Sequence, residues 1–253
     1  MEKISIKVII TALSLSLIGC SSSDDVNIEN VPNKSAQTLF SDASKALDNG
    51  LFQKAIQLLS AIDSRFPFGP ISHQVQIDLI YAYYKSGDAD QGLALADRFL
   101  KLNPTHTNVD YVYYMKALIN LSTEENLFQD IVGIDRSDRD PTASRNAFEG
   151  FKKIITDFPE SKYAADSRKR MIDIKERLAR YELSVARFYL KRDAWASAAN
   201  RGRYIIEYYS PSKQVEEALE IMIECYDKLK LDDLKNNAKQ VLAANFPNNR
   251  LLK

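Results

Sequence analysis

Apolar and polar positions along most of the chain follow the three-to-four-residue spacing of amphipathic helices. From residue 50 onward one order of landmarks returns: a glycine, a small residue five positions later, apolar residues nine and twelve later, and a proline seventeen later. Full copies begin at Gly50 and Gly87, and partial copies lie in residues 147–159, 198–211 and 238–247. The pattern predicts five helix pairs, each ended by a proline that cannot continue the second helix.

This spacing resembles the tetratricopeptide repeat, a pair of antiparallel helices of about 34 residues. The glycine permits a tight turn, and the small residue lets the two helix axes approach. Because each pair leaves an apolar face uncovered, neighbouring pairs must stack. The resemblance implies an all-α fold: a right-handed α-α superhelix of about five repeats forming one domain over residues 35–253. An irregular helical bundle with chance spacing of alanine and proline is the alternative.

Two segments depart from the repeat. Between Leu121 and Ala143 lies an insertion that lengthens the third repeat. Residues 161–192 contain neither glycine nor proline and keep a helical apolar period. They predict one helix of about 30 residues that joins the front repeats to the back ones.

The start of the chain has a different pattern. A basic beginning with two lysines is followed by an apolar run over residues 8–18, which is too short to cross a bilayer and is typical of a secretory signal. The run ends in Leu-Ile-Gly-Cys, residues 17–20, which resembles the bacterial lipobox. That resemblance implies a signal peptide of residues 1–19, cleavage before Cys20 and attachment of acyl chains there, which make a durable membrane anchor. A soluble secreted protein with an incidental cysteine is the alternative.

The residues after the cysteine add two expectations. Ser21 follows Cys20, and the sorting rule that accompanies the lipobox resemblance then implies the outer membrane, with the protein facing the periplasm. Residues 20–34 are rich in serine, aspartate and asparagine and lack an apolar period, so they predict a flexible, lipidated tether.

Composition narrows the function classes. The chain has 45% hydrophobic residues but only eight glycines and eight prolines, which favours a helix-rich, well-packed protein. Without residues 1–19 the net charge is about −1, so no nucleic-acid partner is expected. With Cys20 committed to lipid, Cys225 has no disulfide partner, and its apolar surroundings predict a buried, inert thiol.

Catalytic patterns were not found. The histidines, His73 and His106, lie in or beside inter-repeat turns, and no cysteine or second histidine is expected near either, so no metal site is expected. No phosphate loop, nucleophile elbow or zinc-protease helix occurs. In residues 135–140 aspartates alternate with arginines, which is more typical of a solvated loop than of an acid–base pair. The sequence therefore predicts a protein that is not an enzyme and needs no cofactor.

The repeat register predicts a peptide-binding groove. In tetratricopeptide arrays, positions 2, 5, 9 and 12 of each first helix line the concave face. In the second repeat, and in part of the third, these positions are Gln74, Ile77, Tyr81, Tyr84, Tyr111 and Tyr114. Tyrosines offer apolar area with a polar tip, and so suit an extended peptide. The alternative is that some of them pack between repeats, as is expected of Tyr83 and Tyr113.

A basic segment predicts a second binding surface. Residues 162–203 carry twelve basic and five acidic side chains, a local net charge of +7. Such an excess favours docking on an acidic partner, whereas a solvated helix face is the alternative.

Five loop and helix motifs extend the resemblance to one family. They are residues 64–70 (SRFPFGP), 78–85 (DLIYAYYK), 98–106 (RFLKLNPTH), 110–115 (DYVYYM) and 133–141 (GIDRSDRDP). Together they resemble the YfiO family, lipoproteins of the β-barrel assembly machinery. The family resemblance implies five repeats, no catalysis, and a role in folding and inserting β-barrel proteins into the outer membrane. Its implied partners are a POTRA domain of BamA at the back repeats, and unfolded barrel substrates and BamC at the front repeats, besides other lipoproteins of the machinery.

Within that resemblance, Arg201 matches an arginine that contacts BamA, and Arg192 and Arg203 are assigned to the same partner-binding set. Because a side chain that reaches a partner adds little to its own repeat, the fold is expected to survive Arg201→Glu. A tetratricopeptide lipoprotein that scaffolds periplasmic cell-wall enzymes is the competing function, and it should lack the five motifs. A lytic transglycosylase is disfavoured, because no sequence remains for its catalytic domain.

Overall fold

The computed structural model describes residues 28–125 and 140–252. Within these ranges the chain forms α-helices, one short 3₁₀ helix and no strand. In chain order they are α1 (Ala36–Asp48), α2 (Phe52–Arg65), α3 (Ser72–Ser86), α4 (Ala89–Leu102), α5 (Val109–Glu125), α6 (Thr142–Asp157), α7 (Ala164–Leu190), α8 (Trp195–Tyr208), α9 (Val215–Lys228), α10 (Asp232–Asn245) and η4 (Arg250–Leu252). The all-α expectation is confirmed.

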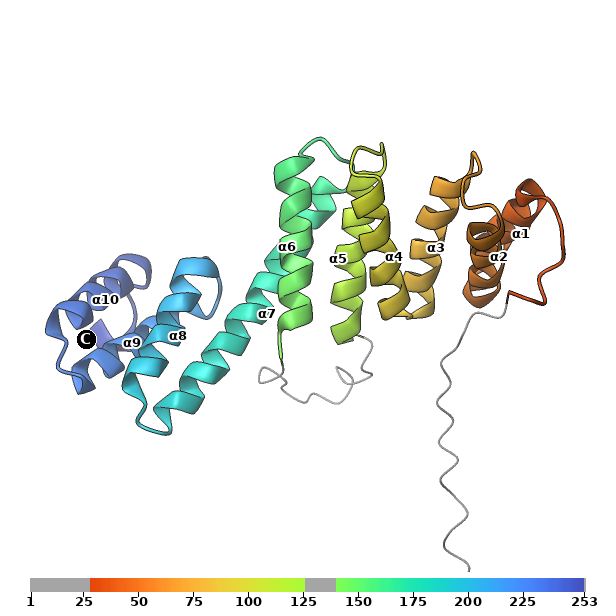
Figure 1. Ribbon diagram of the computed structural model, residues 1–253. Helices are drawn as coiled ribbons and strands as arrows, with labels where there is room; N and C mark the ends of the chain where they lie inside the picture. The colour runs from red at the N-terminus through yellow and green to blue at the C-terminus, as the bar shows by residue number, and fades with distance from the viewer. Residues whose placement is uncertain (1–27, 126–139, 253) are drawn as a thin grey trace, which may run out of the picture.

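The helices form successive pairs, in which each helix packs mainly on its neighbours in the sequence. Figure 1 shows α1 to α6 standing side by side as a front group and α8 to α10 gathered as a back group, with α7 running between the two. The first helices of neighbouring pairs also touch, as α3 and α5 do. This is the stacked arrangement that the sequence period predicts, with pairs α1–α2, α3–α4, α5–α6, α7–α8 and α9–α10.

The landmarks of the repeat lie in the core. Small and apolar landmark residues of the second helices are fully buried between helices: Ala55, Leu59, Ile62, Ala96, Phe99, Ala147, Phe151, Ile154, Ala198, Ile205 and Leu242. Where a glycine begins the copy, it has a positive φ, +70° at Gly50 and +82° at Gly87. That left-handed conformation favours glycine, and it turns the chain from the first helix of a pair toward the second.

Small residues also set how closely the helices cross. A Cβ built on Gly202 of α8 would lie 2.8 Å from Met222 Cγ and 2.9 Å from the backbone oxygen of Ala218, both on α9. A Cβ on Gly150 of α6 would lie 2.9 Å from Ala117 Cβ on α5. These crossings are therefore too tight for any larger side chain.

The predicted long helix is confirmed as α7, which has 27 residues and packs on α6, α8 and α9. It belongs at once to the end of the front group and to the fourth pair. Across the two described ranges, no helix combines the length and the apolar character needed to cross a bilayer. The greater part of the insertion, residues 126–139, falls outside the described residues, as do Cys20 and the signal segment.

The segment before α1 departs from the expectation of a flexible tether. The Arg65 guanidinium, at the end of α2, donates hydrogen bonds to the carbonyl oxygens of Ile28 (3.1 Å), Val31 (3.0 Å) and Pro32 (3.2 Å). Val31 is only 7% exposed, because it packs into the core of the first repeat. The boundary of the folded body therefore moves from residue 35 to Ile28. The Arg65 guanidinium supplies hydrogen-bond donors to backbone carbonyl oxygens that lie outside any helix and so accept no helical hydrogen bond.

We expect Arg65→Gln to release this segment, because a glutamine amide cannot reach three carbonyl oxygens on separate residues. Limited trypsin digestion, with fragments identified by mass, should show faster cleavage after Lys34 than in the unaltered protein. Arg98→Gln is the matched control, since Arg98 pairs with Asp63 of α2 (2.7 Å) but does not bond residues 28–32. Equal cleavage after Lys34 in the two variants would contradict the assignment.

Candidate functional site

An aromatic wall runs across α3, α5 and the start of α7. Tyr114 stacks on Tyr163, with ring centroids 4.7 Å apart and planes 19° apart. Tyr111 lies 5.4 Å from Tyr163, measured between ring centroids. Burial raises the pKa of Tyr111, and the neighbouring Tyr163, Asp78 and Tyr81 raise it further. We call Tyr81, Tyr111, Tyr114 and Tyr163 the aromatic wall. These four and Tyr84, which lies on α3 with Tyr81, are half-buried, so each keeps part of its surface accessible.

A polar network fixes this wall to α7. The Tyr114 hydroxyl donates to Asp166 Oδ2 (2.6 Å), and Arg170 Nε donates to the same oxygen (2.5 Å). Burial raises the pKa of Tyr114 to about 12, and its bond to the Asp166 carboxylate adds to the rise. Tyr114 is therefore neutral at physiological pH and remains a hydrogen-bond donor. Tyr163 and Asp166 were not predicted as site residues, since neither occupies a groove position in the repeat register.

The front end of the predicted groove holds both polar and buried positions. Gln74 is exposed and donates to Asp78 Oδ1 (2.7 Å). Burial raises the pKa of the Asp78 carboxyl, and the Gln74 bond opposes that rise. Tyr81 packs edge-on against Phe52 of α2, with centroids 6.4 Å apart. Ile77 is only 4% exposed, so its assignment to the accessible groove is corrected: its side chain belongs to the core.

Between the front group and the back group of helices, a buried carboxylate joins α6, α7 and α8. Glu182 of α7 has a side chain 1% exposed, and both of its oxygens are bonded by arginines. Arg145 Nη2 of α6 donates to Oε1 (2.9 Å), and Arg201 Nη1 of α8 donates to Oε2 (2.9 Å). We call Arg145, Glu182 and Arg201 the arginine clamp. A buried carboxylate requires such compensation, so Arg201 has a structural role that was not predicted from the sequence.

Two of the three arginines predicted as one partner-binding set, Arg201 and Arg203, lie on different faces of α8. Arg201 and Arg203 are two positions apart on α8, which places them about 200° apart around the helix axis. Arg201 faces α7, whereas Arg203 Nε lies 3.7 Å from Glu207 of its own helix. Arg192 lies beyond the end of α7 with its guanidinium 3.5 Å from the Phe188 ring centroid. Arg201 nevertheless keeps 40% of its side chain exposed, so a partner can still approach it.

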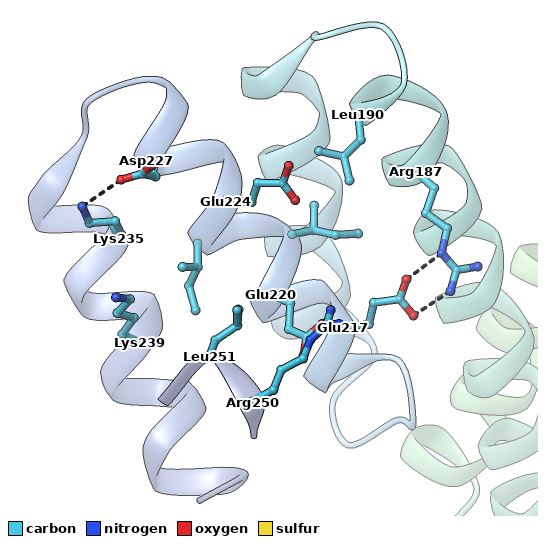
Figure 2. A pocket seen from close by; sticks show the side chains of 12 residues that line it. Arg187, Leu190, Glu217, Glu220, Glu224, Asp227, Lys235, Lys239, Arg250 and Leu251 are labelled. Carbon is cyan, nitrogen blue, oxygen red and sulfur yellow. Dashed lines mark hydrogen bonds and ion pairs between the residues drawn. The ribbon is translucent and has the colours of Figure 1, made fainter. Parts of the chain in front are cut away.

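A cleft of about 640 Å³ lies among α7, α9, α10 and η4 (Figure 2). Much of its charged rim is internally paired: Arg187 bonds both oxygens of Glu217 (2.6 Å each), and Arg250 bonds Glu220 (3.0 Å). Its apolar residues are Leu190, Ile221, Ile223 and Leu251. Apolar area inside a polar rim is the usual composition of a site where a protein segment docks.

The two histidines lie against each other, and the described cysteine is buried. Contrary to the sequence expectation, His73 and His106 do lie together, with ring centroids 5.1 Å apart, beside Phe99. Within the described ranges, no group of three or more His, Cys, Asp or Glu side chains is placed to hold a metal ion. Cys225 is buried, and burial raises the pKa of its thiol to about 11, so it is unreactive at neutral pH.

Taken together, the stacked helix pairs define an α-helical repeat protein that presents an aromatic wall and a cleft. A family model described as outer membrane lipoprotein, YfiO, matches residues 32–241, which is most of the chain. The chain belongs to the YfiO family.

Relatives with curated names are similar over nearly their whole length. A protein of Vibrio cholerae named outer membrane protein assembly factor BamD is 46% identical over 92% of this chain and 95% of its own. Proteins with the same name from Pasteurella multocida (39% identical, 97% of this chain, 92% of its own) and Neisseria meningitidis serogroup B (37% identical, 98% and 94%) are also similar. These matches confirm the family resemblance and the helical repeat fold.

Proposed function

We propose that this protein is a non-enzymatic assembly factor that helps to fold and insert β-barrel proteins into the outer membrane. The observation that carries the proposal is the family match over residues 32–241, with relatives named as outer membrane protein assembly factors along nearly the full chain. The structure supports a scaffold because its accessible features are docking surfaces: the aromatic wall in front and the cleft at the back.

The aromatic wall is the proposed receptor for extended segments of unfolded barrel proteins. Its half-buried tyrosines offer flat apolar faces with polar tips, and Gln74 and Asp78 add polar groups at its front end. An extended segment with alternating apolar and polar side chains matches such a surface. BamC and the other accessory lipoproteins are proposed partners of the same machinery.

The back of the molecule is the proposed docking region for a POTRA domain of BamA, with Arg201 as a contact. Its guanidinium is held in place by Glu182 and remains 40% exposed, so one edge is positioned without the usual loss of side-chain freedom. Arg192 and Arg203 flank the region on other faces and are proposed as contacts at its rim.

We propose that acyl chains on Cys20 hold the protein to the periplasmic leaflet of the outer membrane. Cys20→Ala should therefore release the protein from outer membranes prepared without BamA, because several buried acyl chains provide the anchor. The measurement is the protein in membrane and soluble fractions, with mass analysis of the amino terminus. A Cys225→Ala variant, which alters a buried thiol, should stay in the membrane fraction. Retention of the Cys20→Ala variant in membranes would refute the anchor.

The decisive experiment for the function is affinity purification of the lipidated protein from outer membranes, with identification of what co-elutes. Recovery of BamA supports the proposal. Recovery of cell-wall enzymes in place of barrel-assembly components would overturn it.

A further inference from the structure

One inter-repeat turn differs from all the others that the structure describes. After the proline that follows each second helix, the next residue is Thr105, Glu160, Ser212 or Asn248 in four of the turns. In the α2–α3 turn it is Phe68, whose side chain is 98% exposed. The rest of that turn, residues 66–71, contains no charged and no hydrogen-bonding side chain. Pro67, Phe68 and Pro70 are all exposed and adjacent, so they form a small contiguous apolar patch, and a patch of this kind is a candidate contact site.

The same turn lies next to the point where the chain leaves the folded body. Arg65 immediately precedes the turn, and its guanidinium binds the carbonyl oxygens of Ile28, Val31 and Pro32. The last described residue toward the amino terminus is therefore held against the end of α2. Only residues 21–27 lie between Cys20 and Ile28. The eight steps from Cys20 to Ile28 span at most about 29 Å when fully extended, which sets the greatest distance between Ile28 and the lipid.

We propose that the 66–71 turn rests on the inner leaflet of the outer membrane, with Phe68 inserted between the lipid head groups. The proposal rests on the acylation of Cys20 stated above. An uncharged turn enters the interface without stripping water from a charge, and an aromatic side chain is well placed at that depth. A single phenylalanine binds a membrane weakly. The short segment between Cys20 and Ile28 keeps the turn near the bilayer, however, so the effective concentration of the turn at the membrane surface is high.

The consequence is orientation. A protein anchored by acyl chains alone can rotate about the linker that joins it to the lipid. A second contact with the membrane fixes which face of the protein is turned to the bilayer. Since Phe68 sits at the junction of the first two repeats, the contact holds α2 and α3 at the membrane and sets the position of the aromatic wall beyond them. Phe68 is thus a positioning residue for the front repeats.

The test uses tryptophan as a depth probe in the full, lipidated chain. Trp195, the one native tryptophan, is changed to phenylalanine, and Phe68→Trp is compared with Thr105→Trp, the equivalent position of the next turn. Each protein is reconstituted into vesicles of phosphatidylethanolamine and phosphatidylglycerol, with or without bromine on the acyl chains. We expect the Phe68→Trp variant alone to lose emission to the bromine and to shift its emission maximum to shorter wavelength.

The two variants carry the same probe, so a difference between them reports position and not the preference of tryptophan for membranes. Equal emission from both variants on vesicles that carry them would overturn this proposal and leave the acylation intact. If neither variant floats with the vesicles, the acylation itself is refuted, and this proposal fails with it.

Discussion

Reversing the charge of Arg201 with Arg201→Glu is expected to lower the free energy of unfolding by about 3 kcal/mol. The change removes one of the two cations on buried Glu182 and brings a second carboxylate toward it. Loss of one partner of a buried pair costs about 3–5 kcal/mol, and the lower figure applies because Arg145 remains and Arg201 is partly in solvent. Urea unfolding followed by circular dichroism measures the loss.

Arg203→Glu, two residues away on the same helix, is the matched control. Its partner Glu207 lies 3.7 Å away, and both side chains are more than half exposed, so we expect a change below about 1 kcal/mol. Unaltered stability of Arg201→Glu would contradict the structural role of the clamp. It would restore the expectation, drawn from the sequence, that this side chain serves a partner alone.

The clamp also shows how docking and folding can be separated at Arg201. Charge reversal confounds the two, because an unfolded back half cannot bind BamA. A double change, Glu182→Gln with Arg201→Gln, removes the buried charge together with one of its cations, so it should be far less destabilising than the single reversal. Loss of BamA from pull-downs of this folded variant supports the proposed contact, and full retention argues against it.

Gly202→Val is expected to destabilise the protein by about 3 kcal/mol, the upper end of the usual range for overpacked cores. A Cβ at this position would lie 2.9 Å from the backbone oxygen of Ala218, which can move away only if α8 and α9 separate. Ala196→Val, at an exposed position of the same helix, measures the intrinsic cost of valine in a helix, which is well below about 1 kcal/mol. Equal unfolding free energies for the two variants would show that the crossing is not tight.

The parts of the fold that sequence could predict are those set by local pattern. Ala147, Phe151 and Ile154 recur at fixed spacing, and burial follows directly because that spacing puts them on one helix face. The length of α7 was equally readable, since nothing in residues 161–192 interrupts a helix. The groove positions came from the same register; Tyr81, Tyr111 and Tyr114 are half-buried, and their role in binding a peptide stays a prediction.

The features that sequence did not predict depend on helix crossings. Glu182 meets Arg145 and Arg201 only because α6 and α8 both pack on α7, and the two arginines are 37 and 19 positions from Glu182 in the sequence. Tyr163 joins the wall from just before α7, outside the repeat register. Residues 28–34 are polar enough to suggest a tether, and their attachment depends on the reach of Arg65 across more than 30 positions of sequence. The prediction for Ile77 was wrong because the repeat register gives the direction of a side chain around the helix axis and not how deeply that side chain is buried.

The length of α7 also bears on the order in which this protein can fold. At about 1.5 Å per residue its 27 residues extend about 40 Å, and its two ends serve different neighbours. Because a chain is made from its amino terminus, α1 to α6 are complete before α7 is there to cover the open side of α6. That cover is α7, and α7 in turn needs α8 for its other half. The front group of helices therefore lacks the helix that covers its last apolar face until the chain has been made as far as Tyr208, where α8 ends.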